Sequence, residues 1–347
     1  MKIGKVSESV LKRSILKQIK TKRNEVLNGA GVGEDCAILS FKEQESCAVS
    51  TEPTVLGNGR TVRHAVIKAT NNLAAGGAQA IAVMIAAMLP ESIEEPDIKV
   101  LMAEAESVCK ELNIQLAGGH TSVSEEVKKP ILTVTAIGKL CRENTGTELT
   151  QKGLIKETMH LGKAVADCTE KAGLDVVATK WIALEATTIL AREKEKDLLT
   201  KYPTHLVEEA KGFEQYLSVS AEAATAVKSG AFIMHDASEG GIFGALWELA
   251  ERLGVGLEID LKKIPVKQET IEVCEYFDLN PYEIISGGCL LIVTRDGFDL
   301  INALAKEQIP AVVIGKTTGN NDRIVVKDEE RRFLEPRKTD EIYKVKF

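Results

Sequence analysis

The sequence predicts a mixed protein of the α+β class, divided into two domains. Its 347 residues exceed the size of one typical core, for which about 150 residues per domain is a guide. In both halves, short apolar runs of strand length alternate with stretches whose apolar residues recur at helical spacing. The polar stretch at 141–160 shows neither pattern, so we expect domains at 1–145 and 155–347.

Composition excludes several classes of protein. Acidic residues outnumber basic ones by 51 to 44, and this argues against a nucleic-acid groove because phosphate backbones select basic surfaces. The most hydrophobic stretch, Leu73 to Leu89, contains Gly76, Gly77 and Gln79 and is shorter than the roughly 20 residues that a membrane helix needs. Seven scattered cysteines form no CxxC pair, and the lysine-bearing start has no apolar signal core, so a cytoplasmic location is expected.

The first half is expected to hold three helices and five strands. Ser7 precedes apolar residues at Val10, Leu11, Ile15 and Ile19, a pattern typical of a capped helix. The other helices are expected at 61–75 and along the apolar face from Ile98 to Leu112. The expected strands are Cys36–Leu39, Cys47–Ser50, Ala80–Met88, Gln115–Ala117 and Ile131–Gly138.

The second half is expected to alternate strands with helices. The expected strands are Leu174–Thr179, Ala231–Met234, Gly256–Asp260, Cys289–Thr294, Ala311–Ile314 and Arg323–Val326. Helices are expected at Trp181–Ala191, 268–277 and 298–306, and between Ile242 and Gly254, where the glycine ends the helix.

Neither common phosphate-binding loop fits this sequence. Gly315-Lys316-Thr317 matches the end of a Walker A loop, but Pro310 occupies the place of its first glycine. A dinucleotide-binding fingerprint beginning at Gly29 would need its third glycine at Glu34. The hydrolase elbow and the metalloprotease HExxH motif are also absent from the sequence.

Five other segments bring acids or glycines to expected strand ends or helix starts. They are Gly33-Glu34-Asp35-Cys36-Ala37, Thr51-Glu52, Thr70-Asn71-Asn72, Gly118-Gly119-His120-Thr121, and Asp236 with Gly240-Gly241. Carboxylates at strand ends can hold Mg²⁺ on a phosphate, while paired glycines and helix-start amides can approach phosphate oxygens. Each segment alone is equally typical of a solvated turn or an exposed polar pair. Their order along the chain carries the information.

That order resembles the superfamily of aminoimidazole ribonucleotide synthetase, over nearly the whole chain. Three stretches, 234–241, 254–259 and 286–290, resemble the type of the hydrogenase maturation factor HypE. The resemblance implies an N-terminal half-barrel domain that a second copy completes, hence a homodimer, and a C-terminal α/β domain. It also implies ATP bound near the dimer interface, with its γ-phosphate activating a carbonyl, amide or phosphate oxygen of a small substrate.

The resemblance also implies roles for particular residues. Asp35 matches a Mg²⁺ ligand, Glu52 stands where the family usually has an Asp that reaches the metal, and Asn72 replaces an Asp. His120 replaces an acid; it would contact a phosphate, bond a substrate or remain a neutral turn residue. Asp236 matches the acid of the C-terminal domain, which makes it the candidate catalytic residue together with His120. The candidate nucleotide-binding residues are Gly33, Asp35, Glu52, Asn72, Gly118, Gly119, Thr121, Gly240 and Gly241.

The departures from the family pattern also predict lost chemistry. Asn72 and His120 together remove two acids, so Mg²⁺ affinity should fall, because ligand charge drives the binding of hard cations. The HypE type ends in a tail whose cysteine accepts a carbamoyl group, and selenophosphate synthetase uses a thiol near its start. No cysteine follows Cys289 or precedes Cys36, which is expected in the core, so both thiol chemistries are expected to be absent.

Three functions follow as alternatives. The first is an ATP-dependent enzyme that phosphorylates a small substrate, supported by Asp35 and Asp236. The second is a nucleotide-binding accessory or maturation protein that acts with a partner protein and without turnover, supported by Asn72 and His120. The third is an oligomeric scaffold that binds no nucleotide. Nucleic acid and membrane are excluded as partners on composition.

Overall fold

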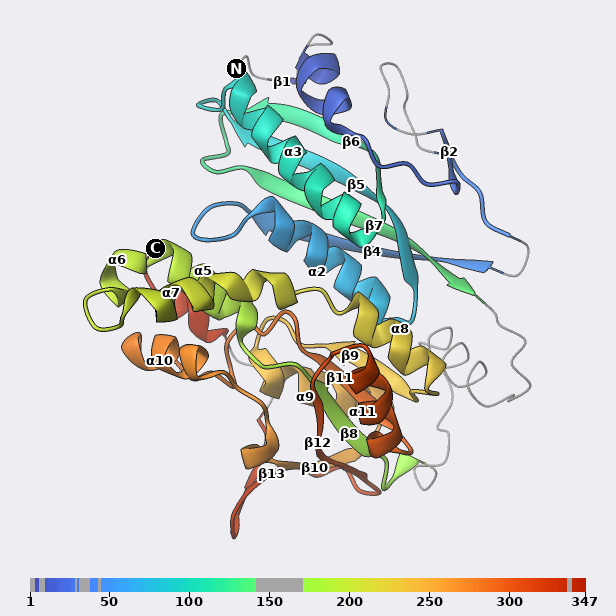
Figure 1. The fold of residues 1–347 in the computed structure, drawn as a ribbon, viewed down its shortest axis with the longest axis vertical. Helices are drawn as coiled ribbons and strands as arrows, with labels where there is room; N and C mark the ends of the chain where they lie inside the picture. Colours follow the sequence, from blue (N-terminus) through green and yellow to red (C-terminus); the bar gives the residue numbers. More distant parts are fainter. Residues whose placement is uncertain are drawn as a thin grey trace. The chain divides into compact units, whose positions relative to one another are not determined.

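The structure is a computed structural model that describes residues 4–5, 10–28, 30, 38–42, 45–141, 171–335 and 339–347. The chain divides into two compact units, which are coloured blue to green and yellow-green to red in Figure 1. Unit 1 comprises Met1–Ala74 and Ala78–Arg142, and unit 2 comprises Ala75–Gly77 and Glu143–Phe347. Both units combine helices with a sheet, so the predicted α+β class is confirmed.

Unit 1 is built on a five-stranded sheet in the order β1-β6-β5-β7-β4. Its strands are β1 (Gly4–Lys5), β4 (Glu45–Val55), β5 (Gln79–Pro90), β6 (Gln115–Ser124) and β7 (Ile131–Cys141). Strands β5 and β6 run parallel and are joined through helix α3 (Glu95–Leu112), while the other neighbours are antiparallel. A short pair, β2 (Val26–Asn28) and β3 (Ile38–Leu39), packs Val26 and Leu39 against Ile81 of β5.

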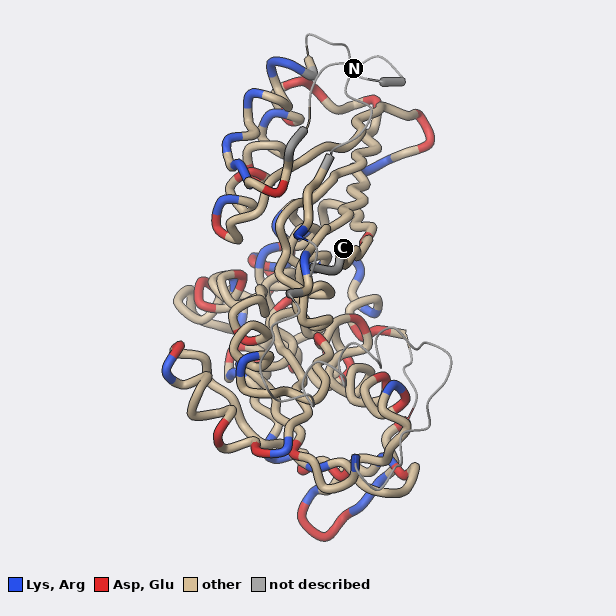
Figure 2. The backbone as a smooth tube through the Cα atoms, turned by 90° about the vertical axis from the view of Figure 1, so that its right-hand side faces the viewer, with Lys and Arg blue, Asp and Glu red and all other residues tan. Residues whose placement is uncertain are grey.

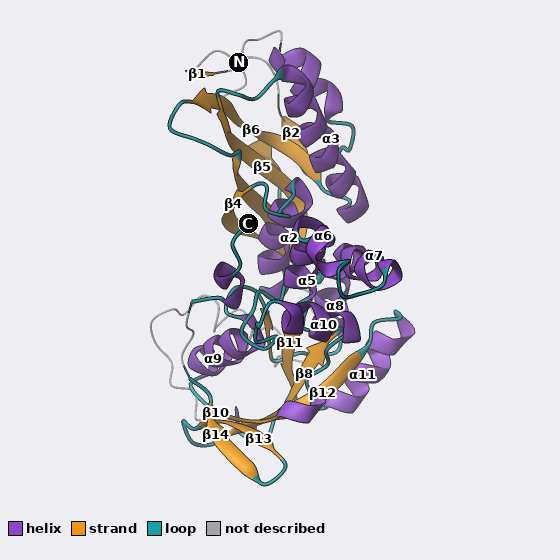
Figure 3. Cartoon of the chain, turned by 90° about the vertical axis from the view of Figure 1, so that its left-hand side faces the viewer, coloured by secondary structure: helices purple, strands orange, loops and turns teal. Residues whose placement is uncertain are grey.

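The helices of unit 1 cover one face of this sheet, as Figure 3 shows for α2 (Val62–Ala75) and α3. Helix α3 begins at a capping box between Glu94 and Asp97 and ends at Asn113, which adopts a left-handed conformation. Its buried stripe includes Ile98, Met102, Ala105, Val108 and Cys109, as the helical spacing predicted. The helix expected after Ser7 appears as two short turns, Leu11–Ile15 and Leu16–Gln18; Ser7 lies outside the described residues.

The second face of the sheet is open, since no helix of unit 1 covers it within the described ranges. Strand side chains alternate between the two faces, and those directed away from α2 and α3 are exposed on β4 and half-buried on β7. Three of them are large and apolar: Val49 is 61% exposed, Val55 51% and Met88 46%. We call this surface the open sheet face.

Two of the expected strand ends in unit 1 were wrong. Strand β4 continues through Thr51-Glu52 to Val55, and β6 continues through Gly118–Thr121 to Ser124. The polar and glycine residues at these places do not end the strands, because the ladder hydrogen bonds join backbone groups and half of each strand faces solvent. The candidate residues therefore lie inside strands and not in turns.

Unit 2 is built on a seven-stranded sheet in the order β14-β13-β10-β12-β8-β11-β9. Its strands are β8 (Asp175–Thr179), β9 (Ile233–Asp236), β10 (Gly256–Asp260), β11 (Leu290–Thr294), β12 (Ala311–Thr318), β13 (Arg323–Lys327) and β14 (Glu330–Phe333). Its helices are α5 (Leu184–Glu193), α6 (Glu195–Leu198), α7 (Thr204–Gly212), α8 (Ser220–Lys228), α9 (Gly241–Leu253), α10 (Gln268–Tyr276) and α11 (Gly297–Lys306). The six expected strands are present, whereas β14 and helices α6, α7 and α8 were not expected from the sequence.

Charge is spread unevenly over unit 1. Basic residues gather along the segment from Lys12 to Arg23, while acids and bases are interspersed over most other parts drawn in Figure 2. Part of this segment is neutralised locally, since Arg13 pairs with Glu95 and Arg23 with Glu25. None of the helices in the described ranges has the length and apolar character to cross a membrane.

Candidate functional site

The first candidate segment cannot be placed. Gly33, Asp35 and Cys36 lie outside the described residues, so their predicted roles stay predictions. The candidate residues of unit 1 that the structure does place are Glu52, Asn72 and the segment from Gly118 to Thr121.

The structure brings Glu52 and Asn72 into direct contact between β4 and α2. The side-chain amide of Asn72 donates to Oε1 of Glu52 at 2.8 Å and also lies 3.1 Å from Oγ of Ser50. The other carboxylate oxygen of Glu52 lies 3.1 Å from Nζ of Lys68. We call Ser50, Glu52, Lys68 and Asn72 the Glu52 cluster.

By themselves, the four residues of the Glu52 cluster do not fit a Mg²⁺ ligand set, while Asp35, the other predicted ligand, lies outside the described residues. One oxygen of Glu52 accepts from Asn72, and the other forms an ion pair with Lys68, which neutralises the carboxylate. Within the described ranges, no group of three or more His, Cys, Asp or Glu side chains is arranged to hold a metal ion. Sequence reasoning missed Lys68, although its spacing of four from Asn72 on a helix was the available signal.

Gly119 serves the packing of strands β5 and β6, and Gly118 lies beside it in β6. The register between these strands shifts between Val83 and Met84, which marks a bulge in the β6 segment beside the glycines. A Cβ on Gly119 would lie 2.0 Å from the carbonyl oxygen of Ile85, so only glycine permits this close approach. This contact accounts for Gly119 without any ligand.

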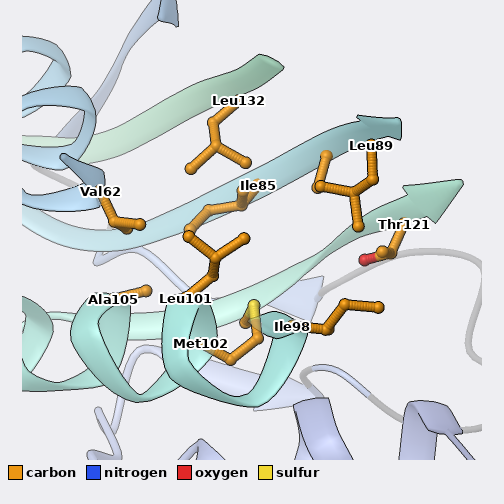
Figure 4. A pocket seen from close by; sticks show the side chains of 10 residues that line it. Val62, Ile85, Leu89, Ile98, Leu101, Met102, Ala105, Thr121 and Leu132 are labelled. Atoms are coloured by element: carbon orange, nitrogen blue, oxygen red, sulfur yellow. The ribbon is translucent and has the colours of Figure 1, made fainter. Parts of the chain in front are cut away.

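His120 and Thr121 point to opposite faces of the sheet, because successive side chains of a strand alternate. Thr121 lines a small apolar hollow beneath α3, together with Ile85, Ile98 and Met102 (Figure 4). His120 is exposed, and its register partner on β5 is Ala86. Thr121 and His120 therefore cannot act on the same group within one copy of unit 1.

Glu52 and Thr121 are also far apart. They lie on β4 and β6, which are separated by β7 and β5 in the sheet. Three strand spacings of about 4.8 Å place these strands roughly 14 Å apart. One ion cannot bind both side chains directly.

Unit 2 gathers a second set of candidate groups at one end of three neighbouring strands. Asp236 ends β9 and pairs in register with Leu290, the first residue of β11. The backbone N–H of Leu290 in turn bonds to Oγ1 of Thr179 at the end of β8, at 3.0 Å. Asp236 is 8% exposed, and the Ser286–Gly288 turn leads into the same strand end.

The Gly240-Gly241 start of α9 is occupied by the chain itself. The N–H of Gly240 donates to Oδ2 of Asp340 at 2.6 Å, and the N–H of Gly241 donates to the carbonyl of Ser238 at 3.1 Å. Burial raises the pKa of Asp340, which is 2% exposed. These two amides are therefore already bonded within unit 2, and sequence reasoning had not foreseen the capping carboxylate.

Buried cysteines in both units are poorly suited to thiolate chemistry. Burial raises the pKa of Cys109, Cys274 and Cys289 to about 12. Cys289 is fully buried and directly precedes β11, whose expected start at Cys289 is one residue too early. At neutral pH these three thiols stay protonated, and the nucleophile in cysteine chemistry is the thiolate.

Models of one protein family match both units, the N-terminal domain model first along the chain and the C-terminal domain model second. The model of the AIR synthase related protein N-terminal domain matches residues 33–140, and that of the C-terminal domain matches residues 171–328. The chain belongs to this family. The two matched ranges include Glu52, Asn72, His120 and Asp236 and all strands of the two sheets except β1 and β14, with β7 matched except for its last residue.

Relatives extend the family likeness over nearly the full length. The chain is 23% identical over 333 residues to a putative hydrogenase expression/formation protein of Methanocaldococcus jannaschii, covering 93% of this chain and 91% of that protein. The fold is similar to that of hydrogenase maturation protein HypE solved in complex with ATP, with 14% identity, a TM-score of 0.74, and coverage of 96% and 95%. HypE in a HypE–HypF complex has a TM-score of 0.65 at 16% identity, with coverage of 84% and 90%.

Proposed function

We propose that this chain binds ATP through unit 1 and uses its terminal phosphate to activate an oxygen of a small substrate. The observation that carries the proposal is the family membership of both units together with the fold shared with an ATP-bound HypE. Asp35 remains the predicted nucleotide contact and Mg²⁺ ligand on its motif alone. We derive no step through a metal, since the Glu52 cluster does not fit one.

In this proposal Asp236 is the acid that handles a proton or orients the substrate. It is a nearly buried carboxylate at a strand end, a place where rigid backbone holds a side chain in a fixed orientation. Phosphorylating a carbonyl, amide or phosphate oxygen turns that oxygen into a leaving group, so the protein must mainly position the reactants and stabilise charge. His120, on β6 of unit 1, is the second candidate catalytic residue and acts as a phosphate or substrate contact.

We further propose that the active form is a homodimer joined through the open sheet face. The exposed apolar side chains of Val49, Val55 and Met88 lie on that face, and their burial would remove apolar area from water. Two-fold pairing of one patch with itself is the commonest closed assembly. In such a dimer His120 would lie at the interface.

A second candidate function is that of a nucleotide-binding accessory protein without turnover. Asn72 and Lys68 favour it, because the place expected for two acids now holds one neutralised carboxylate. The similarity to HypE in a HypE–HypF complex supports a maturation partner protein in this case. Binding without turnover is the feature that separates the two candidates.

Two measurements test the proposal. ATP at about 100 times its Kd should stabilise the chain by roughly 2.7 kcal/mol and raise its melting temperature, if one site binds the folded state alone. ADP release should then appear with at least one member of a panel of amides, carbamates and ribonucleotides, and fall in Asp236→Asn. Stabilisation by ATP without ADP release from any substrate would select the accessory protein. If no nucleotide raised the melting temperature, both candidate functions would be contradicted. The remaining alternative would then be a scaffold that binds no nucleotide.

A further inference from the structure

The Glu52 cluster is built so that its two helix residues act on one carboxylate. Lys68 and Asn72 are four apart on α2 and therefore lie on the same side of the helix. Ser50 and Glu52 are two apart on β4 and share a face of the strand. Lys68 bonds one oxygen of Glu52 and Asn72 bonds the other, so the contacts form a closed arrangement.

The charges of this cluster sum to zero. Glu52 contributes one negative charge and Lys68 one positive charge, while Ser50 and Asn72 are neutral. A divalent cation needs anionic ligands, and here the only carboxylate of the four residues is already paired. The side chains are also partly shielded, with exposed fractions of 25% for Lys68 and 22% for Glu52.

Asn72 is suited to Lys68 and not to a metal. A carboxylate at position 72 would lie within 2.8 Å of Glu52 and repel it unless a cation bridged the two. The amide instead donates to Glu52 and lies within hydrogen-bond distance of Ser50. The amide of Asn72 and the ammonium of Lys68 thus both stabilise the single remaining carboxylate, Glu52.

We propose that Lys68 takes the place of a divalent cation at Glu52, and that its ammonium contacts phosphate oxygens of ATP directly. An ammonium carries three N–H donors, and the contact with Glu52 uses one of them. Lysine serves elsewhere as a point-charge binder of phosphate. The contact with ATP rests on the proposed function, whereas the exclusion of a metal from Glu52 does not.

The metal part is tested with Mn²⁺ alone, without nucleotide, by electron paramagnetic resonance of the free ion. Glu52→Gln should leave Mn²⁺ affinity within about twofold of the unsubstituted chain. Glu25→Gln is the matched control, because Glu25 is also a carboxylate of unit 1 paired with a lysine, Lys139. A drop of about tenfold or more in Glu52→Gln alone would overturn the proposal.

Removing Lys68 and restoring an acid at position 72 should create a metal site at Glu52. The double variant Lys68→Ala/Asn72→Asp should bind Mn²⁺ at least about tenfold more tightly than the unsubstituted chain, and adding Glu52→Gln should abolish the gain. A folded double variant with no Glu52-dependent gain would overturn the idea that Lys68 occupies a cation position. Far-ultraviolet circular dichroism and a melting curve establish that each variant is folded.

The nucleotide part is tested by ATP binding in EDTA. Lys68→Met should lower the affinity for ATP by about tenfold or more. Lys68→Arg should retain most of that affinity because it keeps the positive charge. Lys110→Met, an exposed lysine in the last turn of α3, is the control and should have no effect. Unchanged ATP affinity in a folded Lys68→Met would overturn this part. If the unsubstituted chain bound no ATP, the proposed function would fail while the Mn²⁺ results still stood.

Discussion

The two sheets of this chain are buried in different ways. All five residues of β11 in unit 2 are buried, and four of the five residues of β8 beside it. Strand β4 of unit 1 instead alternates, with Val49, Thr51, Pro53 and Val55 exposed. Unit 2 therefore covers its central strands on both faces with its own chain, whereas unit 1 leaves one face for something else to cover. The difference explains why we place the dimer interface on unit 1.

A charge on the open sheet face should have the largest effect. Val49→Lys would bury an unpaired ammonium in the proposed interface, which costs about 3 kcal/mol or more and weakens the dimer by at least roughly a hundredfold. Light scattering should then fall from twice the chain mass of 37.6 kDa to the mass of one chain. Phe298→Lys, at a 72% exposed position on α11 of unit 2, should remain dimeric. A dimeric Val49→Lys would place the interface elsewhere.

The same substitution in the two sheets should cost different amounts. Val293→Ala in β11 removes a fully buried side chain and should lower the free energy of unfolding by about 2–3 kcal/mol. Val49→Ala in β4 should cost less than about 0.5 kcal/mol when the protein is dilute enough to be monomeric, because that side chain is 61% exposed. Urea unfolding measures both. If the two substitutions lowered the free energy of unfolding equally, the open sheet face would have to be covered within a single chain.

This contrast also separates what the sequence predicted from what it did not. Strand Gly256–Asp260 was predicted at its observed bounds, and the strand beginning at Cys289 within one residue, because both are short and largely apolar. The half-exposed strands of unit 1 were cut short, since Thr51-Glu52-Pro53 and Gly118-Gly119 are typical of turns when seen alone. Such strands are recognised by the alternation of exposed and buried residues, and a continuous apolar run is not needed.

The candidate site was predicted unevenly for a similar reason. The proximity of Glu52 and Asn72 was implied by family resemblance and is present in the structure. Lys68 and Asp340 escaped notice because their roles depend on partners 16 and 100 residues away, at Glu52 and Gly240. Helical spacing places Lys68 beside Asn72, but it does not identify Glu52 as their shared partner. No spacing links Asp340 to Gly240.

Removing the cap of α9 should have a moderate effect confined to unit 2. Asp340→Ala would leave the N–H groups of Gly240 and Ile342 without their carboxylate acceptor and should cost about 1–2 kcal/mol, as for other lost caps. Asp328→Ala, which breaks an exposed ion pair with Lys262, should lower the free energy of unfolding by only about 0.3 kcal/mol. Thermal unfolding compares them. If Asp340→Ala were no worse than Asp328→Ala, the cap would be energetically unimportant.

The smallest expected effect is a pH dependence of unit 1. Arg23, and then Lys139, hold the pKa of Glu25 at about 2, below its ordinary value near 4.5. A lowered pKa stabilises the fold above the unfolded pKa, and that contribution is lost as pH falls toward 2. Glu25→Gln should therefore be less stable than the unsubstituted chain at pH 7, and the gap should narrow between pH 5 and pH 2. A gap independent of pH would contradict the ion pair as its cause.

Calorimetric titration of the full chain with ATP tests the central claim most directly, because the proposed activity and the proposed roles of Asp35 and Lys68 all depend on nucleotide binding. We predict saturable binding of one ATP per chain, weakened by Asp35→Asn and unaffected by Glu34→Gln, its neighbour in the sequence. Losing one charged contact should cost roughly 2–3 kcal/mol, or about 30- to 150-fold in affinity. No saturable heat with ATP, at concentrations up to the millimolar range, would contradict the account.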